Sequence, residues 1–192
     1  VRAALLAGKS VVTANKQVIA RQPALLTLAE RQGRQLRFEG AVGGAMPIIR
    51  ALGDGLSGDR VERLDAILNG TANAVLSRMD EAGCTMDEAI ADACASGYAG
   101  EDLSVDLDGA DAAAKLAILC ALGFGLKINP ADIETRTTLR VTPEDFAESR
   151  ERGITIRQIA HADFDRGRGA LTVWVAPIGV RPADAFSVDI DR

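Results

Sequence analysis

The pattern of hydrophobic and polar positions predicts helices alternating with short strands over the first quarter of the chain. Residues 1–6 read as a helix that ends at Gly8, and the apolar run over 10–15, with two β-branched valines, reads as a buried strand. Further elements are expected over 16–20 (helix), 23–32 (amphipathic helix) and 35–38 (strand). Helix, glycine, strand and helix in succession are typical of an α/β sheet.

The alternation continues through the rest of the chain. A strand over 61–68 is expected to lead into a helix over 72–80 with Thr71 as its N-cap. Thr85 and Glu88 have the spacing of a capping box at the start of a helix over 85–95. The last expected elements are a helix that opens at Asp111, a helix over 143–152 with Thr142 as N-cap, and two strands over 154–162 and 170–180. The polar turn over 163–169 makes these strands a hairpin or an adjacent antiparallel pair.

Composition narrows the class of protein. The 192 residues are 47% hydrophobic and 26% charged, which suits one sizeable core or a domain with part of another. No apolar run approaches the roughly 18 residues of a membrane span and no signal peptide is evident, so we expect a soluble, cytoplasmic protein. A net charge of −5 with intermixed signs argues against nucleic-acid binding. We expect buried thiols and no zinc, because Cys84, Cys94 and Cys120 lack metal-ligand spacing.

A glycine-rich run, EGAVGGAMPII, follows the strand over 35–38. Gly40, Gly43 and Gly44 indicate either a positive φ or a close approach of the backbone to another group. Glu39 and the loop carbonyls could coordinate a hard cation through oxygen. The alternative is a tight strand-to-helix turn in which Pro47 is the first residue of a helix, and the residues alone favour this turn.

The stretch GYAGEDLSVDLDGADAAAKLAIL, residues 97–119, joins an acidic loop to an alanine-rich helix. Asp111 and Lys115 are four residues apart and therefore share one helix face. Apolar neighbours are expected to desolvate the Lys115 ammonium partly, which suits proton transfer, while Asp111 would orient it. An ordinary i,i+4 ion pair on a solvated helix is the alternative, and spacing alone favours it.

Two further places could hold a ligand. In open α/β sheets ligands lie beyond the carboxyl ends of strands, where Lys16 and the Thr13-Ala14-Asn15 segment fall. The Asn69-Gly70-Thr71 segment precedes a helix whose N-terminus could bind an anion. A solvated lysine and plain helix capping explain the same residues equally well.

The order of the motifs carries more information than any single motif. AGKSVVTANK, FEGAVGGAMPII, LNGTANAVL and GYAGEDLSVDLDGADAAAKL occur in this order, and together they resemble the catalytic region of homoserine dehydrogenase from Val1 to about Val180. Members of that family are oxidoreductases of threonine, methionine and isoleucine biosynthesis. They interconvert aspartate 4-semialdehyde and homoserine with NADP or NAD as cofactor, and they are commonly homodimers.

The resemblance implies an α/β fold in two parts. Residues 1–21 would be the tail end of a Rossmann dinucleotide-binding domain, and residues 22–192 an α+β catalytic, substrate-binding and dimerisation domain with a mixed sheet covered by helices. The chain begins without methionine inside a helix, and Gly43-Gly44 is not a phosphate loop at a first strand–helix junction. We therefore expect a chain cut at both ends that is inactive alone.

The resemblance also implies roles for individual residues. Lys115 would be the catalytic acid and base, with Asp111 as its partner and Lys16 as a second active-site lysine near the nicotinamide. The remaining implied roles are substrate binding by Asp106, Gly70, Thr71 and Tyr98, cofactor binding by Thr13, Ala14 and Asn15, and a monovalent cation site, usually sodium, at Glu39 with the carbonyls of Val42, Gly44 and Met46.

One position departs from the family pattern. Gly100 occupies the place of the glutamate that binds the substrate amino group, and Glu101 follows it. Either Glu101 binds the amine or the substrate differs. Two alternatives to a homoserine dehydrogenase therefore stay open: a related NAD(P)-dependent dehydrogenase for another short hydroxy acid or semialdehyde, and a non-catalytic dimerising fragment or homologue.

Overall fold

The computed structural model describes residues 1–44, 46–97 and 103–181. These residues form two compact units. The first contains Val1–Arg63, Ala114–Ile133 and Ala162–Thr172, and the second contains Leu64–Ala113, Glu134–His161 and Val173–Arg192 as far as it is described. Packing units need not coincide with domains, so the predicted domain boundary after residue 21 stays a prediction.

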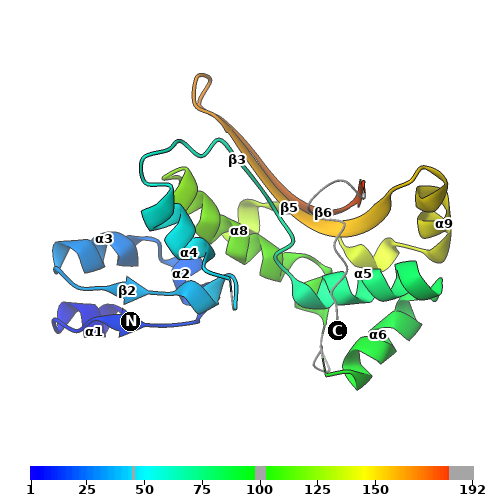
Figure 1. Ribbon diagram of the computed structural model, residues 1–192. Helices are drawn as coiled ribbons and strands as arrows, with labels where there is room; N and C mark the ends of the chain where they lie inside the picture. The colour runs from blue at the N-terminus through cyan, green and yellow to red at the C-terminus, as the bar shows by residue number, and fades with distance from the viewer. Residues whose placement is uncertain (45, 98–102, 182–192) are drawn as a thin grey trace. The chain divides into compact units, whose positions relative to one another are not determined.

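The first unit begins with the predicted alternation of helices and short strands, drawn in blue in Figure 1. Its elements are α1 (Arg2–Leu6), β1 (Val11–Val12), α2 (Lys16–Arg21), α3 (Ala24–Arg31) and β2 (Leu36–Arg37). β1 and β2 are parallel, with Val11 opposite Leu36, and α3 packs against both α1 and β2. Because the strands are parallel, their carboxyl ends meet at one edge.

The glycine-rich run forms a tight turn into a short helix. It contains a 3₁₀ turn, η1 (Glu39–Ala41), and then α4 (Ile48–Arg50), which continues into a π-helical turn, η2 (Ala51–Gly55). The prediction that Pro47 is the first helical residue is wrong. Pro47 is the N-cap of α4, because its ψ of 49° lies outside the helical region.

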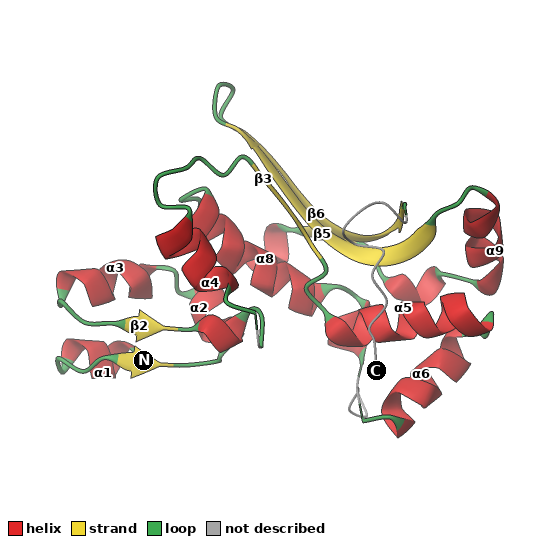
Figure 2. Cartoon of the chain, viewed as in Figure 1, coloured by secondary structure: helices red, strands yellow, loops and turns green. Residues whose placement is uncertain are grey.

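The second unit is built around α5 (Gly70–Ala82). This helix packs against α6 (Met86–Ala95), α7 (Ser104–Leu107) and α9 (Pro143–Glu151). Figure 2 shows α5, α6 and α9 in red. The side chains of its core come from these helices, from strand β5 and from the loop positions Leu103 and Val141: Ala72, Val75, Leu76, Met79, Ala89, Ala93, Leu103, Leu107, Val141, Phe146 and Ile156. Helix α8 (Ala110–Gly123) begins in this unit and continues in the first.

A four-stranded mixed sheet has the order β3-β5-β6-β4. Its strands are β3 (Arg63–Ala66), β4 (Glu134–Thr135), β5 (Thr155–Asp165) and β6 (Ala170–Val180), and two short 3₁₀ turns, η3 (Pro130–Asp132) and η4 (Thr138–Arg140), flank β4. β4 and β6 are parallel. β5 and β6 are neighbours joined by four residues, a connection that only antiparallel strands allow. The mixed sheet with helices confirms the predicted α/β class.

The boundaries of the hairpin differ from the prediction. Residues 163–165 extend β5 instead of forming the turn. The Phe164 backbone N–H donates to the Glu62 carbonyl at 2.8 Å, and the Phe164 ring packs 5.8 Å from that of Phe124. Hydrophobic packing at Phe164 thus outweighs the turn preference of its charged neighbours.

Helix caps follow the sequence in two cases and not in a third. The capping box of Thr85 and Glu88 is formed, and Thr142 caps α9 as predicted. The predicted cap at Thr71 is wrong, because α5 begins at Gly70 and Asn69 is its N-cap.

None of the helices in the described ranges has the length and apolar character that crossing a bilayer would require.

Candidate active site

A buried asparagine joins the predicted substrate and catalytic aspartates in the second unit. Asn69 Nδ2 donates to Asp106 Oδ1 at 2.6 Å and to Asp111 Oδ2 at 2.9 Å. Its Oδ1 accepts the Ala72 backbone N–H at 2.7 Å and so caps α5. Asn69 is 3% exposed and Asp111 is 2% exposed. One amide therefore ties the start of α5 to α7 and α8.

Three side chains hold the backbone of α7, which carries Asp106. Gln158 on β5 is buried and donates from Nε2 to the Asp106 carbonyl at 3.1 Å. Thr138 Oγ1 donates to the Leu107 carbonyl at 3.0 Å, and Thr137 Oγ1 lies 3.4 Å from the same oxygen. The Asp106 carboxylate is thus fixed through both its side chain and its backbone.

Gly109 makes the turn from α7 to α8. Its φ is +83°, and a Cβ there would lie 3.1 Å from Val175 Cγ1. Both the left-handed conformation and the close approach of β6 require glycine. The Gly109 turn therefore fixes the position of Asp111, which lies in the first helical turn of α8.

Lys115 lies one turn after Asp111 on α8 and is half-buried. The residues between them, Ala112, Ala113 and Ala114, are each 1% exposed, and Leu116 is fully buried. The apolar setting predicted for this lysine is therefore present. Gly70 and Thr71 directly follow Asn69, so the structure brings their segment to the aspartate pair.

The Thr13–Lys16 segment lies at the carboxyl end of β1 in the first unit, as predicted. The Asn15 side chain caps α2 through Val18 N at 3.1 Å, and Thr13 Oγ1 accepts the Asn15 N–H at 3.1 Å. A Cβ on Gly40 would lie 3.2 Å from Ala14 Cβ. Small residues therefore let the loop after β2 approach the loop after β1.

Close approach, and not positive φ, explains two of the three glycines of the glycine-rich loop. Gly40, Gly43 and Gly44 are all absent from the described glycines with positive φ. A Cβ on Gly43 would lie 3.1 Å from Met46 Cβ. Of the two explanations that the sequence left open, close packing applies to Gly40 and Gly43.

Glu39 serves as a helix cap in this structure. Its two carboxylate oxygens accept the backbone N–H groups of Ile49 at 2.7 Å and Arg50 at 3.2 Å, and the Met46 carbonyl accepts that of Ile48 at 2.9 Å. These oxygens keep lone pairs that could face a cation, so the donor set fits a small hard ion. Val42 is buried and Gly44 exposed, and the cation role of the four residues stays a prediction.

Two predicted substrate-binding residues, Tyr98 and Glu101, lie outside the described residues, as does Gly100. Recognition of the substrate amine therefore stays a prediction.

A different glycine pattern, GDGLSG at 53–58, matches the GxGxxG spacing. It lies in the π-helical turn and the bend after it, between α4 and β3. Because it does not join a strand to a helix, it is not a phosphate loop.

The roles of several polar residues at these sites were not predicted. Asn69 was named only as part of the Asn69-Gly70-Thr71 segment, and its capping role could have been recognised, since asparagine is a preferred N-cap and precedes Gly70 directly. Gln158 gave no signal within a strand-like run. His161 Nδ1 lies 2.7 Å from Asp65 Oδ1, and its ring stacks on Trp174 with centroids 4.7 Å apart. Asp65, His161 and Trp174 come from the adjacent strands β3, β5 and β6, respectively.

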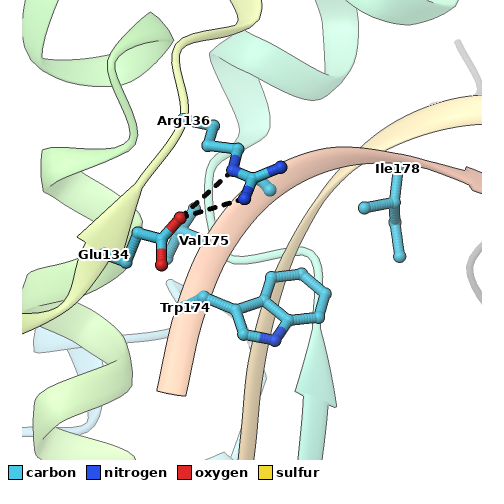
Figure 3. A pocket seen from close by; sticks show the side chains of 6 residues that line it. Glu134, Arg136, Trp174, Val175 and Ile178 are labelled. Atoms are coloured by element: carbon cyan, nitrogen blue, oxygen red, sulfur yellow. Dashed lines mark hydrogen bonds and ion pairs between the residues drawn. The ribbon is translucent and has the colours of Figure 1, made fainter. Parts of the chain in front are cut away.

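A hollow of about 190 Å³ lies beside Trp174 on the sheet of the second unit (Figure 3). The residues that line it are Glu134, Arg136, Trp174, Val175, Ala176 and Ile178. Arg136 and Glu134 form an exposed ion pair with a 3.1 Å contact, as the dashed lines show. Among the residues that the structure describes, none of the predicted site residues lines this hollow, and the charges of Glu134 and Arg136 neutralise each other.

Comparison with known proteins gives a consistent answer. A family model described as homoserine dehydrogenase matches residues 47–189. The homoserine dehydrogenase of Mycobacterium bovis is 44% identical over 178 residues, which are 91% of this chain and 40% of that protein. The chain thus spans about two fifths of the length of this curated relative.

Solved structures agree with the sequence matches. A homoserine dehydrogenase from Thiobacillus denitrificans aligns with a TM-score of 0.91 and 35% identity over 98% of this chain and 44% of that one. A hyperthermophilic archaeal homoserine dehydrogenase in complex with NADPH aligns with a TM-score of 0.80 and 30% identity, over 98% of this chain and 54% of that one. The fold of the described residues is therefore that of these proteins.

Proposed function

Because the chain belongs to the homoserine dehydrogenase family, we propose that the full-length protein interconverts aspartate 4-semialdehyde and homoserine with NADP or NAD. The observation that carries the proposal is the pair of aspartates held by Asn69, of which Asp111 lies one helical turn before Lys115 on α8. These residues lie in the two motifs that resemble the substrate and catalytic positions of the family. The reaction would serve threonine, methionine and isoleucine biosynthesis in the cytoplasm.

Lys115 would move the proton in this reaction. When bound, the nicotinamide cofactor supplies a hydride to the aldehyde carbon. The Lys115 ammonium donates its proton to the carbonyl oxygen as that oxygen gains charge, and in the reverse direction the neutral amine accepts the alcohol proton. Asp111, one turn earlier on α8, orients the lysine side chain.

The other residues would bind and orient. Asp106, held at both its side chain and backbone, binds the substrate with Gly70 and Thr71, and Lys16 is the second lysine of the reaction. The edge at Thr13, Ala14 and Asn15 would hold the nicotinamide end of the cofactor, because it lies at the carboxyl end of β1, where open α/β sheets bind ligands. The NADPH complex of the archaeal relative supports this class of cofactor.

Two accessory features complete the proposal. A sodium ion at Glu39, Val42, Gly44 and Met46 would brace the loop that also caps α4. The protein would act as a homodimer, as family members commonly do. Sodium-dependent thermal stabilisation that Glu39→Gln abolishes would support the sodium site. A monomer in sedimentation experiments would contradict the homodimer.

The decisive experiment measures homoserine oxidation by the full-length protein through the absorbance of the reduced cofactor. Lys115→Ala should lower kcat by about 10²–10⁴-fold, the usual contribution of a positioned acid or base, with the fold retained. Lys127→Ala, which removes an exposed lysine, is the matched control and should leave kcat unchanged. Near-normal activity of Lys115→Ala would contradict its role.

The substitution at Gly100 supports a second candidate function, a related dehydrogenase with a different substrate. Homoserine and its des-amino analogue, 4-hydroxybutyrate, differ only in the amine that Glu101 is proposed to bind. A strong preference for homoserine that Glu101→Gln reduces would support amine recognition. Equal use of both substrates would favour the second candidate, and activity with neither would favour a non-catalytic homologue.

A further inference from the structure

We propose that Asn69 is a positioning residue that holds the two active-site aspartates in working geometry through its side-chain amide. This inference rests on the proposed function, and it assigns a role to a residue that touches neither the substrate nor the cofactor in that proposal. Its amide hydrogens point to Asp106 and Asp111, at 2.6 and 2.9 Å. Its carbonyl oxygen caps α5 at 2.7 Å.

The side chain of asparagine is suited to all three contacts at once. The amide group offers two N–H donors and one carbonyl acceptor, and here each hydrogen goes to a different carboxylate. Serine and threonine can cap a helix but have only one donor, and aspartate can cap a helix but has none when ionised. Asn69 is therefore more than an N-cap.

Two neighbouring carboxylates repel each other when both are ionised, unless donors lie between them. Asp111 is 2% exposed, so solvent does little to screen it. The Asn69 amide supplies a donor to each carboxylate, while Lys115 on α8 provides the positive charge one turn away. Without the amide, we expect the Asp106 side chain to turn away from Asp111.

Loss of the Asn69 amide should therefore impair the proposed roles of both Asp106 and Asp111. Asp106 is the proposed substrate ligand, and Asp111 orients the proposed proton donor. A displacement of about 1 Å in such groups can cost about 10²-fold in rate. Asn69 also begins the helix that carries Gly70 and Thr71, so one side chain sets the position of the substrate-binding segment relative to both carboxylates.

Two substitutions in the full-length protein separate positioning from capping. Asn69→Ser keeps a capping oxygen and removes the double donor, and it should lower kcat/KM for homoserine by about 10–100-fold while KM for the cofactor stays unchanged. Asn69→Asp keeps both the shape and the cap but places a third carboxylate beside the other two. We expect it to be more damaging than Asn69→Ser.

This order of damage is the critical readout, because a purely capping role predicts about equal damage from Asn69→Asp and Asn69→Ser. Thr85→Ala is the matched control, since it removes the N-cap of α6, which also packs on α5. It should lower the melting temperature by a few degrees and leave kcat/KM unchanged. Asn69→Asp activity at or above that of Asn69→Ser would overturn the inference.

A crystal structure of Asn69→Ser tests the inference independently of the proposed function. If the parent protein oxidises no homoserine, the function fails, and the structure still decides the role of Asn69. We expect the Asp106 carboxylate to move away from Asp111 in this variant. Unchanged positions of both carboxylates would overturn the inference even in an active enzyme.

Discussion

Asp80 is expected to neutralise a buried guanidinium, so replacing it by asparagine should destabilise the protein strongly. The Arg157 side chain on β5 is 1% exposed, and its Nη1 lies 3.7 Å from Asp80 Oδ2. Thr155 Oγ1 donates to the same carboxylate oxygen and accepts from Arg157 Nη1 at 2.9 Å. Asp80 lies near the C-terminal end of α5, where the helix dipole disfavours a carboxylate, which indicates a tertiary role.

The magnitude follows from the burial of the two partners. Removing one partner of a buried ion pair costs about 3–5 kcal/mol, because the remaining charge is left uncompensated. Asp80 keeps 20% of its side chain exposed, and the more exposed Arg150 also reaches it at 3.6 Å. We therefore expect the lower end of that range, about 3 kcal/mol, for Asp80→Asn.

Urea titrations of the full-length protein can measure this loss in the free energy of unfolding. Asp92→Asn is the matched control, since its pair with Arg78 is about half exposed on both sides and its loss should lower the free energy of unfolding far less. The double variant Asp80→Asn/Arg157→Met should recover most of the stability, because the buried charge is removed as well. Equal losses for Asp80→Asn and Asp92→Asn would refute the reasoning.

Two further predictions concern Cys120 and Gly109. Burial raises the pKa of the Cys120 thiol from 9.0 to about 12, so a thiol reagent at mildly alkaline pH should label exposed Cys94 and spare Cys120 until the protein unfolds. Between pH 9.0 and about 12 only the unfolded chain forms this thiolate, so the free energy of unfolding should fall as the pH rises. Denaturant titrations at several pH values measure this fall, which should be smaller in Cys120→Ala. Gly109→Ala should cost about 1–2 kcal/mol of backbone strain and also lower kcat/KM, because it displaces the turn between Asp106 and Asp111. Gly83→Ala, at φ +63° with open space around it, should show the strain alone, and equal kcat/KM for the two variants would contradict the prediction.

Local patterns predicted most of the helices because they carry their own signals. The capping box at Thr85, the N-cap at Thr142 and the spacing of Asp111 and Lys115 are each contained within one helical turn. The extent of β5 was not predictable in this way. Phe164 extends the strand through its contact with Phe124, forty residues away in the sequence.

In the candidate site, too, residues with a local sequence signal were predicted and residues that act through long-range contacts were not. Motif order indicated Asp106, Asp111 and Lys115, but Asn69 and Gln158 act on them across 37 and 52 residues of sequence, respectively. Such contacts leave no periodic pattern. The expectation that all three cysteines are buried is wrong for Cys94, because it lies on the outer side of α6 while Ala89 and Ala93 face the core.

The stacking of His161 on Trp174 gives the second unit an optical signal of its own. Trp174 is the single tryptophan of the 192 residues, and its ring lies on the same sheet as Arg157. Indole emission depends on the polarity and the quenching groups around the ring, so separating it from His161 should change both its intensity and its colour. Fluorescence from this one side chain would then follow the unfolding of the mixed sheet without any added label.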